Sequence, residues 1–344
     1  MLGMPKLLDR AGFLGATAAV IAAAEPLMAW AQSDPRIDVH HHYASPQWET
    51  TLRAKNVLAP VWSGWTPDRA IEVMNRNGVR KAMLSITTPG VWFGDDAAAR
   101  ILARNCNDYA AQMIADHHDR FGMFVALPLP DIAGSLREIA YGMDTLKADG
   151  VGLLTSYTDK WLGDPYFAPV FEELDNRRAI VYVHPTTAKC CSGLLSGVPD
   201  SAIEYGTDTT RAIAQLIFSG CTKRYPNIRM IFSHAGGTMP FLIDRFVHLA
   251  AREPRYQKLL PDGFLPEARK YYYDTAQVSN AAAMSALMKL MPLSHVLFGT
   301  DYPYLSIEEN IDGLKTCGVF SARDLATLDS RNVSDLFAAA GMRL

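Results

Sequence analysis

Short apolar runs alternate with longer amphipathic segments along most of the chain, and glycine or proline bounds many of the runs. Short apolar runs are typical of buried strands, whereas apolar residues spaced three and four apart indicate helices. We expect eight strands: Ile37–His42, Lys81–Ile86, Gly122–Leu127, Gly152–Leu154, Ile180–His184, Arg229–His234, Tyr271–Thr275 and His295–Thr300. The alternation of these runs with amphipathic segments favours parallel strands joined by crossover helices.

Helical segments follow these strands in turn. We expect helices at Pro67–Arg76, Asp96–Asp116, Ser135–Lys147, Tyr166–Arg177, Thr209–Arg224 and Ala281–Met291, with the last helices near Ser306–Lys315 and Ala322–Ala340. Eight β/α units predict a single-domain (β/α)₈ TIM barrel. An open doubly wound sheet is the alternative, but it favours a glycine-rich turn after the first strand, and none follows Ile37–His42. The long connections Gln47–Trp65, Lys189–Tyr205 and Glu253–Lys270 are expected to form loops at the mouth of the barrel or a lid over it.

The N-terminal segment has a different pattern. Lys6 and Arg10 precede the apolar run Ala11–Ala24, and Ala29-Trp30-Ala31 resembles a cleavage site. The run is shorter than the roughly 20 residues that span a bilayer, so no stable membrane anchor is expected. We predict an export signal over residues 1–31 and the barrel over residues 32–344. Arg10-Ala11 resembles a twin-arginine motif that lacks its second arginine, so a periplasmic location is expected, with a cytoplasmic one if the signal does not function.

Composition and charge narrow the choice of partners. Of the 344 residues, 49% are hydrophobic and 20% are charged, with 33 basic against 36 acidic side chains. Nucleic-acid binding depends on clustered lysine and arginine, which this balance does not favour. We therefore expect a globular protein with a small-molecule ligand and no nucleic-acid partner.

Four of the predicted strands end in residues that bind metals. His40 and His42 end the first strand, His184 the fifth, His234 the sixth and Asp301 the eighth. The carboxyl ends of barrel strands converge on one face, so these side chains should meet there. Since side chains alternate along a strand, His40 and His42 should face the same side and His41 the other.

We assign His40, His42, His184 and Asp301 as ligands of one divalent cation and leave His234 for proton transfer. Three imidazoles and a carboxylate suit Zn²⁺, with Mn²⁺, Fe²⁺ or Co²⁺ as alternatives, and disfavour an all-oxygen Ca²⁺ or Mg²⁺ site. No lysine ends the strand Ile180–His184 to bridge two metals, so a mononuclear site is predicted.

At these residues the chain resembles a known family, the metal-dependent decarboxylases of the amidohydrolase-related group. The matching motifs are Asp38-Val-His40-His-His42, Val183-His184-Pro185, Phe232-Ser-His234-Ala-Gly-Gly and Phe298-Gly-Thr-Asp301-Tyr-Pro. The chain is most similar to 6-methylsalicylate decarboxylases and more distantly to aminocarboxymuconate-semialdehyde decarboxylase. The resemblance implies a homodimeric barrel that removes CO₂ from a small aromatic acid of the ortho-hydroxybenzoic type.

The resemblance also implies roles for individual residues. Arg245 matches an arginine that reaches a neighbouring subunit's substrate in the muconate enzyme, whereas that enzyme's other substrate arginine has no counterpart between Lys55 and Asp68. Trp62 and Trp65 in this loop would instead line a site for an aromatic ring.

In the expected mechanism, protonation of the ring carbon precedes loss of CO₂. Asp301 is the candidate proton donor, and His234 would stabilise a substrate oxygen and relay protons. Arg211 or Arg245 would hold a carboxylate, and Tyr304 would stack on the ring. Metal-assisted hydrolysis or hydration of a lactone, amide or unsaturated acid is the alternative, because the same ligands would activate a water. A non-catalytic metal-binding protein is a third interpretation, but it would need a closed ligand set.

Overall fold

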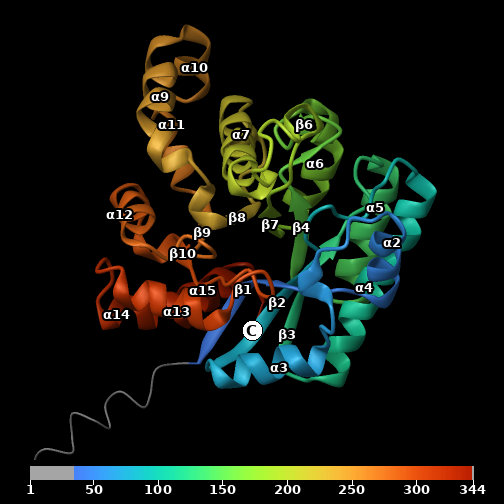
Figure 1. The fold of residues 1–344 in the computed structure, drawn as a ribbon. Coiled ribbons are helices and arrows are strands. Elements are labelled where there is room, and N and C mark those ends of the chain that lie inside the picture. The colour runs from blue at the N-terminus through green and yellow to red at the C-terminus, as the bar shows by residue number, and fades with distance from the viewer. Residues whose placement is uncertain (1–34, 343–344) are drawn as a thin grey trace, which may run out of the picture. The chain divides into compact units, whose positions relative to one another are not determined.

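The computed structural model describes residues 35–342, in which a parallel sheet curls around a central axis with helices outside it (Figure 1). The predicted export signal over residues 1–31 lies outside the described residues. Within the described range, the helices are too short or too polar to cross a bilayer.

Eight strands form the main sheet, in the order β1-β2-β3-β4-β7-β8-β9-β10. They are β1 (Arg36–His42), β2 (Val79–Ser85), β3 (Phe121–Ala126), β4 (Gly150–Leu154), β7 (Ile180–His184), β8 (Arg229–Phe232), β9 (Tyr272–Asp274) and β10 (Val296–Leu297). Backbone bonds between the β1 and β10 segments join the two edges, from Val39 to Phe298 at 3.0 Å and from Asp301 to His40 at 2.8 Å. All eight predicted strands are present, and the (β/α)₈ barrel is confirmed.

The main helices lie on the outer side of the sheet (Figure 1). They are α2 (Pro46–Ala54), α3 (Pro67–Arg76), α4 (Asp96–Asp116), α5 (Ile132–Ala140), α6 (Ala168–Asn176), α7 (Glu204–Phe218), α8 (Cys221–Arg224), α9 (Met239–Arg252), α10 (Pro254–Leu259), α11 (Phe264–Ala268), α12 (Ala281–Leu290), α13 (Ile307–Thr316), α14 (Ala322–Ala326) and α15 (Asn332–Ala339). Short helical turns are η1 (Pro60–Trp62), η2 (Tyr141–Thr145), η3 (Pro165–Phe167), η4 (Lys189–Cys191), η5 (Asp200–Ala202), η6 (His234–Gly236), η7 (Leu293–His295) and η8 (Thr327–Arg331). A small antiparallel pair, β5 (Ser156–Tyr157) and β6 (Lys160–Trp161), follows β4.

The predicted connection Gln47–Trp65 contains a helix. Ser45 caps α2 by accepting a hydrogen bond from the Trp48 amide at 3.2 Å, and Pro46 occupies the first turn. Trp48 and Leu52, four residues apart, lie on one face and are buried. The predicted loop Glu253–Lys270 likewise contains two short helices, α10 and α11. The sequence did not predict them, because helices this short have too few residues for a periodic pattern.

The barrel interior is a distinct apolar cluster. Inward side chains from successive strands form it: Ile37, Val39, Met83, Phe124, Ile180, Tyr182, Ile231 and Leu297. Val333, Leu336 and Phe337 of α15 pack against the same cluster. At the carboxyl ends of β1 and β7, and just after β10, the inward positions are polar instead, and there the candidate site lies.

Candidate metal centre

Four side chains from three parts of the sheet meet at the mouth of the barrel. The ligand atoms of His40, His42, His184 and Asp301 lie within 4.8 Å of one another, and all four residues are buried. Asp301 Oδ1 lies 3.1 Å from His40 Nε2 and 2.9 Å from His42 Nε2. The chain thus forms the divalent metal site that the strand-end pattern predicts.

Each of the three histidines is oriented through its other ring nitrogen. His40 Nδ1 donates to Asp274 Oδ2 at 2.9 Å, His42 Nδ1 to the Ser85 carbonyl at 3.1 Å, and His184 Nδ1 to the Pro185 carbonyl at 2.8 Å. These acceptors cannot donate, so in the neutral form of each ring the proton resides on Nδ1 and Nε2 keeps its lone pair. Such bonds are the usual support of metal-binding histidines.

The unpaired acceptor of Asp301 also fits a cation. Asp301 Oδ1 is buried and has no hydrogen-bond partner among the described residues, although it points at two imidazole Nε2 atoms. A buried carboxylate oxygen without a partner is costly unless a cation neutralises it. His40 Nε2 and His42 Nε2 also face each other at 3.1 Å, which a shared cation turns from a lone-pair repulsion into an attraction.

The electrostatics of the centre point the same way. Burial lowers the pKa of His40, but the carboxylates of Asp301 and Asp274 outweigh it and raise that pKa to about 10. Burial holds the pKa of His184 well below its usual value, and it lowers that of His42 as well. Burial opposes ionisation of Asp301, yet His40 and the hydrogen bonds from its neighbours keep the Asp301 pKa well below its usual range. The centre therefore favours positive charge beside an anionic Asp301.

Strand β1 separates its three histidines as predicted. His40 and His42 turn inward, and their rings are 4.8 Å apart. His41 turns away, donates from Nδ1 to Asp38 Oδ2 at 3.0 Å and stacks on Tyr302. Asp38 Oδ2 also accepts a bond from the Thr300 hydroxyl at 2.6 Å. This bond fastens β1 to the segment that carries Asp301.

Close approach of the backbone requires glycine at position 299. A Cβ there would lie 2.9 Å from the Cβ atoms of both His40 and Asp274. Because residue 299, in the segment after β10, has no side chain, these two residues lie near enough for the Nδ1 bond that orients His40. In the Gly299-Thr300-Asp301 sequence, the glycine thus permits the close approach, the threonine binds Asp38 and the aspartate is a ligand.

His234 lies beside the predicted ligands, within hydrogen-bonding distance of Asp301. Its Nε2 is 3.2 Å from Asp301 Oδ2, and its backbone amide donates to Asp274 Oδ1 at 2.9 Å. Gln277 also donates a side-chain hydrogen bond to Asp301 Oδ2. His234 and Asp301 both have left-handed backbones, with φ of 52° and 63°, a strained conformation that is common at functional sites.

A cavity of about 610 Å³ opens onto this centre. His184 and Asp301 line it, together with Trp62 and Tyr304 of the predicted substrate site. The Trp62 indole Nε1 donates to the Tyr304 hydroxyl at 3.1 Å, and the Tyr304 ring lies 5.9 Å from the ring of His42. The two aromatic side chains thus form one wall beside the ligands.

The other three predicted substrate residues lie elsewhere among the described residues. Trp65 packs edge-on against Trp62 at 5.8 Å and lines a different cavity, next to Tyr302. Arg211, on α7, lies 3.5 Å from Glu204 and 3.8 Å from Asp208, so two carboxylates already neighbour its guanidinium. Arg245 lies on α9, and its side chain is not among those that line the cavity at the metal centre.

Two residues of the site did not emerge from the sequence. Asp274 ends β9, so the strand-end rule that identified the ligands also applied to it. Its carboxylate orients His40, the His234 amide and the Tyr182 hydroxyl. Gln277 lies three residues beyond that strand, in a connection without periodicity, and no pattern indicated its contact with Asp301.

The model of the amidohydrolase family matches residues 37–325 of this chain. The chain belongs to this family. Two curated relatives have similar identity. The decarboxylase yanB of Aspergillus niger is 36% identical over 288 residues, covering 79% of this chain and 78% of that protein. The 6-methylsalicylic acid decarboxylase of Penicillium expansum is 35% identical over 274 residues, covering 78% of this chain and 85% of that protein.

Solved structures share the fold. A dihydroxybenzoic acid decarboxylase from Polaromonas sp., solved with bound manganese and the inhibitor 2-nitroresorcinol, superposes with a TM-score of 0.74. It is 21% identical, and the match covers 88% of this chain and 96% of that one. At this identity the similarity establishes the barrel.

Proposed function

We propose that this protein is a metal-dependent, non-oxidative decarboxylase of a small ortho-hydroxybenzoic acid. The observation that carries the proposal is the pairing of an inward-facing His₃Asp centre with His234 beside its carboxylate. The names of the two curated relatives support the same reaction, and one of them acts on 6-methylsalicylic acid.

His40, His42, His184 and Asp301 would hold the ion, and Zn²⁺ is the metal we propose for this donor set, with Mn²⁺ as the alternative. When bound, the ion supplies positive charge that orients the acid and stabilises negative charge on its oxygens. The neighbouring aromatic wall of Trp62 and Tyr304 would confine the ring of the substrate.

Proton delivery falls to two of the chain's own residues. Direct loss of CO₂ would leave a carbanion in the plane of the ring, where the π-system cannot delocalise it. We assign Asp301 to protonate the carbon that bears the carboxylate, after which the bond to CO₂ breaks and its electrons return to the ring. Because the low pKa of Asp301 keeps it anionic at rest, a proton must first reach it, and His234 Nε2 at 3.2 Å would relay that proton from solvent.

Export and assembly are proposed from the sequence. Residues 1–31 are proposed to direct export to the periplasm and to be removed. A homodimer is proposed from the family resemblance, with Arg245 on α9 reaching the substrate of a neighbouring subunit. Size-exclusion chromatography with light scattering tests the dimer, and N-terminal sequencing of the secreted protein tests cleavage.

A direct test is to incubate metal-loaded protein with 6-methylsalicylic acid and unsubstituted salicylic acid and to follow the product by mass spectrometry. We expect loss of the mass of CO₂, and loss of turnover after chelation. Turnover confined to a parallel panel of lactones and amides would instead identify a hydrolase and overturn the proposal.

A further inference from the structure

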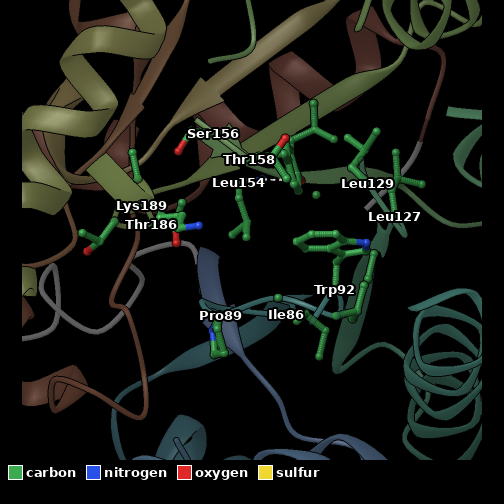
Figure 2. Close-up of a pocket in the computed structure, with 18 of the residues that line it drawn as sticks. Ile86, Pro89, Trp92, Leu127, Leu129, Leu154, Ser156, Thr158, Thr186 and Lys189 are labelled. Atoms are coloured by element: carbon green, nitrogen blue, oxygen red, sulfur yellow. Dashed lines mark hydrogen bonds between the residues drawn. The ribbon is translucent and has the colours of Figure 1, made fainter. Parts of the chain in front are cut away.

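A second cavity, of about 600 Å³, lies at the mouth of the barrel, and Figure 2 shows residues that line it. The residues around it come from the carboxyl ends of β2, β3, β4 and β7, at Ile86, Ala126, Leu154 and Thr186. We call it the apolar chamber. None of the metal ligands or proton-transfer residues lines it, so the reaction as described does not use it.

Two small inward residues create the chamber. Ala126 of β3 pairs with Gly152 of β4, and Gly152 pairs in turn with Tyr182 of β7, whose hydroxyl reaches Asp274 inside the barrel. Residues that pair across parallel strands point to the same side, so positions 126 and 152 face inward as Tyr182 does. Tyr182 extends into the interior and stacks on Phe124, whereas Ala126 contributes only a methyl group and Gly152 no side chain, and both line the chamber.

The backbone conformation at position 152 does not require glycine. A Cβ at this position would meet Phe124 Cβ at 3.5 Å, which is ordinary van der Waals contact, and its φ lies outside the left-handed region. A side chain is therefore sterically tolerated at the backbone, and what glycine contributes here is unfilled volume in front of it. This contrasts with Gly299, where close approach excludes a side chain.

The chamber borders the metal centre directly. Leu154, in its wall, pairs with the ligand His184 on the neighbouring strand, and paired strands lie only about 4.8 Å apart. Pro89 lines both cavities. The Thr88 hydroxyl on the metal side and the Thr186 hydroxyl on the chamber side share a hydrogen bond of 2.9 Å. Both threonines are half-buried, so two small side chains form this part of the partition between the cavities.

The lining defines what the chamber would take. Its inner walls are apolar, with the Trp92 indole lying between Leu154 and Leu127 (Figure 2). Polar residues, Thr158, Asp159 and Lys189, form its exposed rim. A hydrocarbon group fits the inner part, because no charged side chain would be desolvated there. Methylene groups beyond the inner part would reach the exposed polar rim and would not improve binding further.

We propose that the apolar chamber binds a hydrocarbon substituent of the aromatic acid whose carboxylate is held at the metal centre. The inference rests on the proposed function and deepens it: it makes the substrate class salicylic acids with an alkyl side chain, selected by the space that Gly152 and Ala126 leave. Each methylene buried there should improve binding by up to about fourfold, as expected from roughly 0.8 kcal/mol per buried methylene.

The test compares 6-methylsalicylic acid with 6-pentylsalicylic acid on the metal-loaded protein. Dissociation constants come from calorimetry and kcat/KM from product release. We expect the pentyl acid to bind at least tenfold tighter and to have the higher kcat/KM, following the gain of about 0.8 kcal/mol per methylene. Gly152→Leu, which places a side chain in the chamber, should lower the pentyl-to-methyl ratio by about tenfold or more. Gly152→Ala, the matched control, adds only a Cβ and should lower it by less than about threefold.

Each outcome supports or overturns the proposal. Decarboxylation that is insensitive to chain length, or a ratio unchanged in Gly152→Leu at full metal content, would overturn the chamber proposal and leave the proposed function standing. Length-dependent binding without turnover would support the chamber and overturn the decarboxylase assignment. Binding of 3-pentylphenol to chelated protein as tightly as the pentyl acid binds the loaded protein would mark an independent hydrocarbon site, and would also overturn the proposal.

Discussion

The inward-facing residues on the two sides of the barrel mouth serve opposite purposes. On the side of β1, β7 and β10, the inward residues at the strand ends are His42, His184 and Asp301, tightly connected by hydrogen bonds. On the side of β3 and β4, the inward residues Ala126 and Gly152, level with Tyr182 two residues before the ligand His184, leave an open volume. The strands supply inward-pointing positions near the mouth, and the side chains decide whether a position binds a cation or leaves room for a ligand.

The two sides also differ in how firmly their residues are held. Asp274 alone fixes the His40 ring, the His234 amide and the Tyr182 hydroxyl. The chamber walls also have hydrogen bonds, such as that from the Leu154 amide to the Tyr157 hydroxyl at 2.8 Å, but the side chains that face the open volume are apolar and are held by packing. Directional bonds suit ligands that must hold one geometry, whereas apolar walls accept groups of different length.

Of the variants that test the difference between the two sides, removal of a metal ligand should have the largest effect on activity. In His184→Ala, loss of one imidazole should abolish stoichiometric metal binding and lower decarboxylation by about a thousandfold or more, since a bound metal contributes several kcal/mol of charge stabilisation. Metal per chain is measured by elemental analysis and turnover by CO₂ release. His248→Ala, on α9 and away from the ligands, is the matched control and should retain both. A His184→Ala protein with full activity would show that the metal side does not support the reaction.

Asp301→Asn separates metal binding from proton transfer. The amide keeps the size and one oxygen but cannot carry the proton, so we expect a loss of activity of about 100- to 10,000-fold. The variant is to be assayed after loading with excess metal, and its metal content determined on the same sample. An Asp301→Asn protein that is fully loaded and active would contradict the role of Asp301 as donor.

Asp274→Asn tests the orientation of His40. Losing the charged acceptor of the His40 Nδ1 proton should weaken metal binding by about 10- to 100-fold, with activity restored at higher metal concentration. Asp149→Asn is the control from the other side of the barrel, where that carboxylate accepts a bond from the Met123 amide. Competition with a chelator of known affinity measures both variants. Equal metal affinities for the two would mean that Asp274 does not position the ligand.

The smallest effect is expected at the partition between the two cavities. Thr186→Ala removes the partner of the Thr88 hydroxyl, a bond that contributes about 1 kcal/mol. Access to the chamber should become easier, and kcat/KM for 6-pentylsalicylic acid should rise about threefold relative to the methyl acid. A fall in this ratio would show that the bond supports the chamber rather than closing it.

The ligand set followed from the sequence because it depends on two local regularities. Alternation along β1 placed His40 and His42 together, and the convergence of parallel strand ends brought His184 and Asp301 to them. The eight strands were also predictable, because each contains a short run of apolar residues, which is a local pattern. Where a helix was short, as at Pro46–Ala54, the pattern did not distinguish it from a loop.

The remaining features depend on contacts between distant residues. The bonds from Asp274 to His40, and from Gln277 to Asp301, join segments without a shared periodicity, and Arg211 meets Glu204 and Asp208 through side-chain orientation. The chamber is the clearest case, since a glycine and an alanine in a sequence predict no hollow. The register of the sheet places Ala126 beside Gly152, so that the space left by these two small residues forms one cavity. The sequence determined the metal ligands because they follow from local patterns. The cavity depends on which residues become neighbours in space, and the tertiary structure alone decides that.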